Sequence, residues 1–213
     1  MRKLAAQVFM TLDGVVQAPG GPDEDREGGF AHGGWLVPFF DEKLGEAVAT
    51  WLQTAGGLLL GRKTYDIFAD SWPKADDPND PIAVKLNAMP KFVASRSLKD
   101  PAWNNSTVLE GEVTQAMAKL KAQEGGELQT HGSGNLLQTL LRNDLVDELR
   151  IWQFPVVVGA GKRLFGAGAI PASFRLLETQ QNSKGAVLHV YERAGGLRHG
   201  EIEVGEETVL FDE

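Results

Sequence analysis

Apolar and polar positions follow two different periods along this chain. Short, continuously apolar or β-branched runs are typical of strands that are covered on both faces. These runs predict strands at residues 4–10, 57–60, 91–94, 106–109, 128–130, 148–158, 174–177 and 186–192. Segments with apolar residues at three- and four-residue spacing predict helices after Asp41, from about Lys63 to before Pro73, and at residues 113–123 and 135–141.

The alternation of strands and helices predicts an α/β fold with a largely parallel sheet between two helical layers. The chain is rich in strands and poor in helices near its end, which predicts antiparallel strands at one edge. Polar, Gly- and Pro-rich stretches predict loops at residues 11–38 and 73–81.

We expect one domain over residues 1–193, followed by an acidic extension over residues 194–213. Residues 200–213 contain six acidic residues and no basic one. Ile202, Val204, Val209 and Phe211 alternate with polar residues there, so an added hairpin, a strand at a dimer edge and a frayed tail all stay open.

Composition limits the possible functions. The 213 residues are 42% hydrophobic and 23% charged, as in an ordinary globular protein. Cysteine is absent, which excludes disulfides, a cysteine nucleophile and cysteine-ligated zinc. The net charge of −8 disfavours nucleic acid as a partner. Without a signal-peptide pattern or an apolar run of about 20 residues, we expect a cytoplasmic protein that does not enter a membrane.

Two glycine-containing turns carry the main chemical signal. Gly61-Arg62-Lys63-Thr64 and His131-Gly132-Ser133-Gly134-Asn135 each follow a predicted strand and begin a predicted helix. Unpaired N–H groups and the positive end of the helix dipole make such turns anion sites. A helix start with solvated cations, or a simple tight turn, is the alternative for each.

Three known motifs with similar residues fit this sequence less well. Gly56 and Gly61 have the spacing of a Walker A loop, but Arg62 stands where its lysine should follow. Leu137 interrupts a G-x-G-x-x-G pattern, and Ser133 lacks the flanking glycines of a hydrolase nucleophile elbow. We therefore reject a nucleoside-triphosphatase, and the hydrolase interpretation loses its main support.

Ser95, Arg96 and Ser97 follow the predicted strand at residues 91–94. The carboxyl ends of parallel strands lie at one edge of the sheet, so this group can approach Arg62. Two arginines beside hydroxyl groups suit a phosphate monoester and favour NADPH over NADH. A polar loop is the alternative.

Asp13 ends the first strand within Thr11-Leu12-Asp13-Gly14, where we expect it to hold substrate, relay a proton or cap an Asx turn. Trp35 is either a stacking residue beneath a mobile loop or a hydrophobic anchor. The four histidines lack metal-ligand spacing, so we expect no metal.

The motif Leu58-Leu59-Leu60-Gly61-Arg62-Lys63-Thr64-Tyr65, followed by Trp72, resembles the central motif of dihydrofolate reductases. The stretches 131–136, 145–149 and 155–165 are similar to the reductase domain of the bifunctional riboflavin-pathway deaminase-reductase. Thr11-Leu12-Asp13-Gly14 corresponds to the Ser-Leu-Asp-Gly of that family. The resemblance spans about residues 4–192, and the stretch from Trp51 to Trp72 looks more like the stand-alone branch than like the riboflavin enzymes.

This resemblance implies a dihydrofolate reductase-like, three-layer α/β/α fold with a mixed, mostly parallel sheet, usually in a homodimer. It implies NADPH as the cofactor and a small molecule as the substrate. The implied cofactor-binding residues are Gly61, Arg62, Lys63, Thr64, Ser95, Arg96, Gly132, Ser133, Gly134, Asn135 and Leu136. Pro155, Gly159 and Gly161 would shape the substrate side, together with Asp13 and Trp35.

The working hypothesis is an NADPH-dependent reductase acting on a C=N or C=O bond of a small heterocyclic or ribosylated substrate, with Asp13 as the catalytic candidate. No acidic residue stands clearly where folate reductases place their pterin-binding carboxylate, which disfavours folate. The alternatives are 5-amino-6-(5-phosphoribosylamino)uracil reductase of riboflavin biosynthesis, a non-catalytic NADPH-binding or sensor protein, and a structural dimer with a decayed site.

Overall fold

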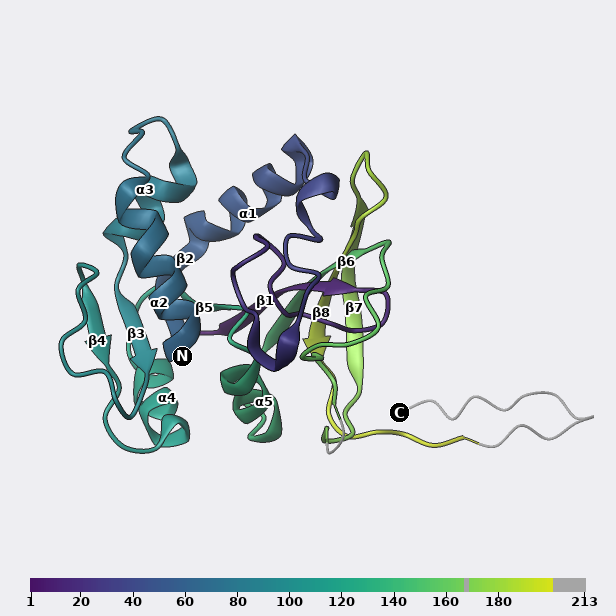
Figure 1. Cartoon of the computed structure of the whole chain (residues 1–213). Helices are drawn as coiled ribbons and strands as arrows, with labels where there is room; N and C mark the ends of the chain where they lie inside the picture. The colour runs from purple at the N-terminus through teal and green to yellow at the C-terminus, as the bar shows by residue number, and fades with distance from the viewer. Residues whose placement is uncertain (167–168, 201–213) are drawn as a thin grey trace, which may run out of the picture.

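A computed structural model describes residues 1–166 and 169–200 of the chain, and Figure 1 shows its elements. The strands are β1 (Leu4–Thr11), β2 (Ala55–Gly61), β3 (Lys91–Ala94), β4 (Ser106–Val108), β5 (Glu127–His131), β6 (Glu148–Phe154), β7 (Phe174–Gln181) and β8 (Val187–Arg193). The helices are α1 (Glu42–Thr54), α2 (Arg62–Ser71), α3 (Pro81–Ala88), α4 (Val113–Ala122) and α5 (Gly134–Arg142).

All eight strands form a single sheet in the order β4-β3-β2-β5-β1-β6-β8-β7. The strands from β4 to β6 pair in parallel, whereas β8 pairs antiparallel with both β6 and β7. This confirms the predicted mixed, mostly parallel sheet with an antiparallel edge. Because the carboxyl ends of the parallel strands face one way, the turns that follow β2 and β5 lie at the same edge.

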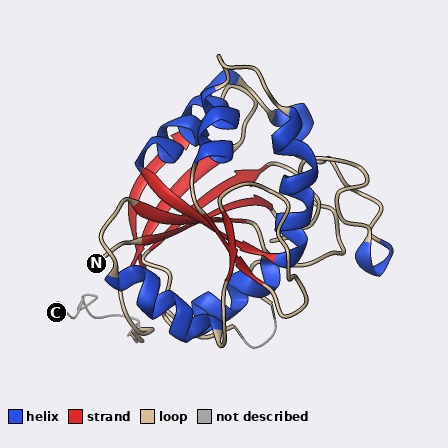
Figure 2. Cartoon of the chain, turned by 90° about the vertical axis from the view of Figure 1, so that its left-hand side faces the viewer, coloured by secondary structure: helices blue, strands red, loops and turns tan. Residues whose placement is uncertain are grey.

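Helices cover both faces of the sheet (Figure 2). On one face, α4 and α5 pack on the central strands through the largest apolar cluster. On the other face, α1 lies over β6 and β8, and α2 and α3 lie over β2 and β3. The three-layer architecture is therefore the one expected from a parallel sheet with short crossover helices.

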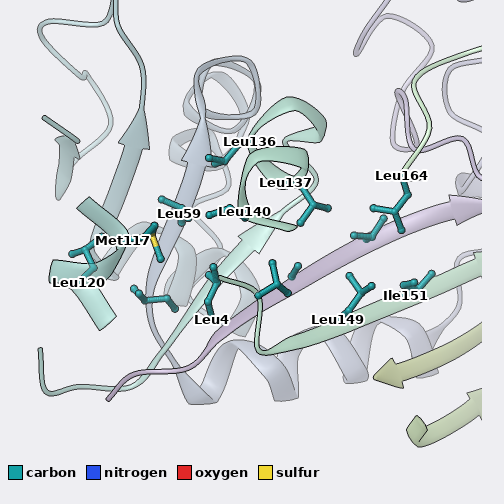
Figure 3. Close-up of a cluster of buried hydrophobic side chains, with 14 residues drawn as sticks. Leu4, Leu59, Met117, Leu120, Leu136, Leu137, Leu140, Leu149, Ile151 and Leu164 are labelled. Atoms are coloured by element: carbon teal, nitrogen blue, oxygen red, sulfur yellow. The ribbon is translucent and has the colours of Figure 1, made fainter. Parts of the chain in front are cut away.

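Helix α5 shows how the hydrophobic pattern builds this architecture. Its residues Leu136, Leu137 and Leu140 lie on one stripe and point toward Leu59 of β2 and the neighbouring central strands (Figure 3). Leu140 is fully buried. The stripe fixes the helix against the sheet and thereby fixes the position of its first residues.

Several predicted boundaries need correction. Helix α3 was not predicted, because its apolar pattern is short. Asp80 caps this helix by accepting hydrogen bonds from the amides of Ile82 and Ala83, and Pro81 occupies its first turn. Strand β6 ends at Phe154, before Pro155, and β7 extends to Gln181. The hairpin or edge strand considered for the acidic tail lies outside the described residues.

The helix expected after Asp41 is confirmed with its cap, because Asp41 Oδ1 accepts from the amide of Leu44 at 3.0 Å. Among the described residues, none of the helices combines the length and the apolar character needed to cross a bilayer. The division between residues 1–193 and 194–213 stays a prediction.

The largest apolar cluster should dominate stability. Replacing the fully buried Leu59 by alanine should lower the free energy of unfolding by about 2–5 kcal/mol, because it removes apolar contacts and leaves a cavity. Leu177→Ala is the control, since Leu177 is 47% exposed and should change stability by less than about 0.5 kcal/mol. Urea unfolding of both variants measures the difference, and equal losses would contradict this account of the core.

Candidate functional site

The two glycine-containing turns lie in direct contact. The amide of Gly61, at the end of β2, donates to Ser133 Oγ at 3.0 Å, just before α5 begins. A Cβ atom on Gly61 would lie 3.3 Å from the Cβ of Ser133, so the backbone approaches closely here. Two segments that are 72 residues apart in sequence thus form one structure at the edge of the sheet.

Both helix starts keep free donors. No side chain caps the first turn of α2 or of α5. Gly132 and Ser133 have φ values of +59° and +55°, and this left-handed pair turns the chain sharply into α5. Ser133 would ordinarily cap its own helix, but its hydroxyl oxygen accepts from Gly61 instead. The unpaired N–H groups of two helices therefore face a common region.

That region opens into a cavity of about 1370 Å³. Ligand pockets commonly measure about 300–1,000 Å³, so this one has room for a dinucleotide beside a second small molecule. It is lined by all eleven residues predicted to bind a cofactor: Gly61, Arg62, Lys63, Thr64, Ser95, Arg96, Gly132, Ser133, Gly134, Asn135 and Leu136. The structure brings this set together, and its binding of a cofactor stays a prediction.

An arginine and two hydroxyl groups meet at one rim of the cavity. Arg62 Nε lies 2.8 Å from both carboxylate oxygens of Asp66, and one of its terminal nitrogens donates to Ser97 Oγ at 3.3 Å. Ser95 Oγ accepts from the amides of Ser97 and Leu98. Arg62 is thus oriented by Asp66 while 43% of its side chain stays exposed to a ligand.

Lys63 is already engaged by acidic residues of the loop that follows β1. Its Nζ lies 2.5 Å from Asp25 Oδ1 and 3.1 Å from Glu27 Oε2. The same two carboxylates bind Lys162 Nζ at 2.7 and 2.6 Å. These four residues form an ionic clasp that joins the start of α2 to the loop after β6, and all four line the cavity.

The clasp controls the charge state of its carboxylates. Burial alone would raise the pKa of Asp25, but hydrogen bonds from Lys162 and Lys63 lower it to about 2. Hydrogen bonds from Lys162 and then Lys63 also lower the pKa of Glu27. In contrast, burial raises the pKa of Glu24, a neighbouring carboxyl group that lines the cavity and accepts from the amides of Gly20 and Gly21.

Asp13 does not line this cavity. Its carboxylate accepts hydrogen bonds from Thr11 Oγ1 at 2.6 Å, from the amide of Gly159 at 2.9 Å and from the amide of Val158 at 3.3 Å. The bond from Thr11 is the main reason why the pKa of Asp13 is lowered. The ionised side chain holds two loops together, and its hydrogen bonds are not those of the Asx turn considered from the sequence. Its catalytic role stays a prediction.

The remaining residues predicted on the substrate side also lie away from the cavity lining. Trp35 is buried, donates from Nε1 to the carbonyl oxygen of Gln17 and packs edge-on against Phe154, so it anchors the long loop. Pro155 is exposed, and Gly159 donates to Asp13. A side chain on Gly161 would collide with Val15 and Phe30. These positions shape the loops around the site.

Other residues line the cavity without having been singled out for it. They include Gln7 of β1, His131 of β5 and Lys162. Gln7 and His131 sit opposite each other in the parallel pair β1–β5 and lie on the same face of the sheet. A polar residue inside an apolar strand was the available signal at Gln7, and its place at the start of the second glycine-containing turn was the signal at His131. In the described ranges, no group of three His, Asp or Glu side chains could hold a metal ion.

Comparison with known proteins identifies the family. The model of the RibD C-terminal domain matches residues 2–188. The chain belongs to this family. Its relatives include the uncharacterized proteins YyaP and YwjB of Bacillus subtilis, both 26% identical to it. Each match covers 91% of this chain, together with 96% of YyaP and 99% of YwjB.

Solved structures of RibD-like proteins share this fold. A putative riboflavin biosynthesis protein from Shewanella has a TM-score of 0.66 at 22% identity, covering 90% of this chain and 99% of that one. The deaminase-reductase of Thermotoga maritima has a TM-score of 0.58 at 14% identity, and the match covers 91% of this chain but 57% of that one. The fold is thus dihydrofolate reductase-like, and family membership supports an oxidoreductase of the reductase type.

The ionic clasp should make part of the free energy of unfolding depend on pH in the acid range. Asp25 has a lowered pKa in the folded protein, so its contribution is present above the unfolded pKa of 3.8 and is lost as the pH falls toward about 2. Asp25→Asn should remove up to about 2 kcal/mol of this pH-dependent term. Urea unfolding between pH 2 and 5 measures it. Asp23→Asn, at a side chain 73% exposed, is the control and should keep the wild-type profile.

Asp13→Asn distinguishes a structural from a catalytic carboxylate. We expect the variant to lose on the order of 1 kcal/mol of unfolding free energy, because two backbone amides and a hydroxyl lose an ionised acceptor. Affinity for NADPH, the cofactor expected from the sequence, should stay within about two-fold of the wild type, since Asp13 does not line the cavity. Full stability combined with abolished turnover would instead restore Asp13 as the catalytic residue.

Proposed function

We propose that this protein is an NADPH-dependent reductase that acts on a C=N or C=O bond of a small heterocyclic or ribosylated molecule. The observation that carries the proposal is the contact between Gly61 and Ser133, which brings two uncapped helix starts to the rim of one large cavity. When bound, NADPH supplies the hydride.

The protein's own contribution is to bind and orient the cofactor and the substrate and to exclude water. Backbone N–H groups at the starts of α2 and α5 would hold the diphosphate, helped by the hydroxyl of Thr64. Arg62, oriented by Asp66, and Arg96 would bind the 2′-phosphate beside Ser95. The fit is supported by the close packing at Gly61, because a side chain there would push the two turns apart.

A narrower candidate is the reduction of 5-amino-6-(5-phosphoribosylamino)uracil. The family match favours it, and the Thermotoga protein with the same fold is described as a deaminase and reductase of this pathway. Oxidation of NADPH on addition of that compound tests this candidate directly. A panel of cyclic imines and ketones tests the broader one. Tight NADPH binding with no turnover of either set would favour a non-catalytic sensor.

The homodimer and the cytoplasmic location stay predictions.

Cofactor preference gives the sharpest test. Trp72 lines the cavity, so tryptophan fluorescence should report titration with NADPH and with NADH. The wild type should bind NADPH more tightly than NADH. Arg62→Ala should weaken the binding of NADPH by up to about 1.5–3 kcal/mol and leave the binding of NADH nearly unchanged. The exposure of Arg62 and its ion pair with Asp66 should keep the loss near the lower value.

Lys74→Ala is the matched control for Arg62→Ala. Lys74 also pairs with a carboxylate four residues away, Asp70, but it lies outside the cavity lining. Its removal should leave both affinities unchanged. Equal affinity of the wild type for NADPH and NADH would overturn the assignment of a 2′-phosphate site.

A further inference from the structure

The floor of the cavity contains polar groups that the cofactor-binding turns do not use. His131 of β5 and Gln7 of β1 are direct neighbours across the parallel pair, and both line the cavity. The walls beside them are apolar, formed by Phe9 of β1, Leu52 of α1 and Phe68 of α2. A polar pair between apolar walls is the arrangement of a site that orients a planar ligand.

His131 is a histidine without a hydrogen-bond partner. Its Nε2 atom is covered by surrounding atoms, and the described residues offer it no donor or acceptor. Burial, and then the charge of Arg150, lowers the pKa of His131 to about 4. The imidazole is therefore neutral at physiological pH, with one N–H donor and one acceptor nitrogen. Because Nε2 is closed off from the cavity while the residue lines it, a ligand can reach the ring through its other nitrogen, Nδ1.

Gln7 supplies the complementary atom. Its Nε2 donates to Gln129 Oε1 at 2.9 Å, while Gln129 Nε2 donates to the carbonyl oxygen of Trp51 and to Glu127. This chain fixes the amide orientation of Gln7, because Gln129 presents its oxygen toward it. Gln7 Oε1 takes part in none of these bonds and is left as a free acceptor next to His131.

Charge at the floor favours a neutral ligand. Glu127 and Glu148 lie nearby on the same face of the sheet, but both are paired with Arg150, at 2.8 and 2.6 Å. Two further carboxylates of the cavity lining, Asp25 and Glu27, are bound in the ionic clasp. Glu127 is the one carboxylate that the described strands β1 and β5 carry, and Arg150 compensates its charge.

We propose that Gln7 and His131 select the substrate by its uncharged edge, with Gln7 Oε1 accepting from a ring N–H and the imidazole N–H of His131 donating to the adjacent carbonyl. The inference deepens the proposed reductase function and rests on it for the identity of the ligand as substrate. A cationic ring, or a ring whose nitrogen carries a methyl group, fits the pair poorly.

Binding of three small probes to the full chain tests this assignment. 2-Pyridone offers an N–H beside a carbonyl, N-methyl-2-pyridone lacks the donor, and 4-aminopyridine is a cation at neutral pH. Titrations are followed by NMR of the histidine ring signals. 2-Pyridone should shift the His131 signals saturably, and the other two probes should bind at least about five-fold more weakly, as expected for one lost hydrogen bond.

Variants assign the effect to the two side chains. Gln7→Leu should weaken the binding of 2-pyridone about five-fold and leave that of N-methyl-2-pyridone unchanged, because the methylated ring has no N–H for Gln7. His131→Phe should weaken the binding of both rings, because both keep the carbonyl to which His131 donates. Thr130→Val is the matched control: Thr130 precedes His131 on β5, its hydroxyl is also buried without a partner, and it does not line the cavity. This variant should bind 2-pyridone like the wild type. If the two site variants do not fold, the comparison of probes on the wild type still decides.

Several outcomes would overturn the proposal. They are unshifted His131 signals with 2-pyridone, equal binding of the methylated ring, preference for the cation, and displacement of 2-pyridone by NADPH from the same floor. Failure of the reductase proposal is separate: it would show as absent NADPH binding, measured by tryptophan fluorescence, while selective binding of 2-pyridone at His131 persists.

Discussion

The hydrogen bond from the amide of Gly61 to the hydroxyl of Ser133 is the contact on which the site depends. It joins two uncharged groups and contributes about 1 kcal/mol, as an ordinary hydrogen bond does. Its importance is geometric, because it joins the ends of two strands that are adjacent in the sheet but distant in the chain. Strand order puts β5 between β2 and β1, and the bond then sets the distance between the two helix starts.

Much of this arrangement follows from sequence. Continuous apolar runs identified the parallel strands, and the leucine stripe of α5 identified the helix that fixes the second turn. The strand-turn-helix pattern around Gly61 and Ser133 was sufficient to predict that their residues share one edge. Helix α3 was missed because eight residues give too few repeats, and its best signals, Asp80 and Pro81, also suit a loop.

The substrate side was harder to predict, for a physical reason. Asp13 and Trp35 follow sequence rules for functional loop residues, yet their polar atoms are used in holding loops together. Gln7 lies inside β1 and His131 is the last residue of β5, so neither side chain could be assigned to the cavity from its own segment. Their meaning depends on register, since pairing β1 with β5 places the two side chains next to each other. Long-range pairing of this kind is not encoded in any single segment.

The ionic clasp has a consequence for the order of events at the site. Lys63 stands at the start of α2, where a phosphate would seek a cation, but Asp25 and Glu27 already compensate its charge. The phosphate of the proposed coenzyme would have to compete with these carboxylates, so its binding and the detachment of the long loop from α2 would be linked equilibria. Lys162 binds the same two carboxylates and would keep the acidic loop attached to the segment after β6. The loop would then lose its contact with Lys63 at the start of α2 and stay bound to Lys162.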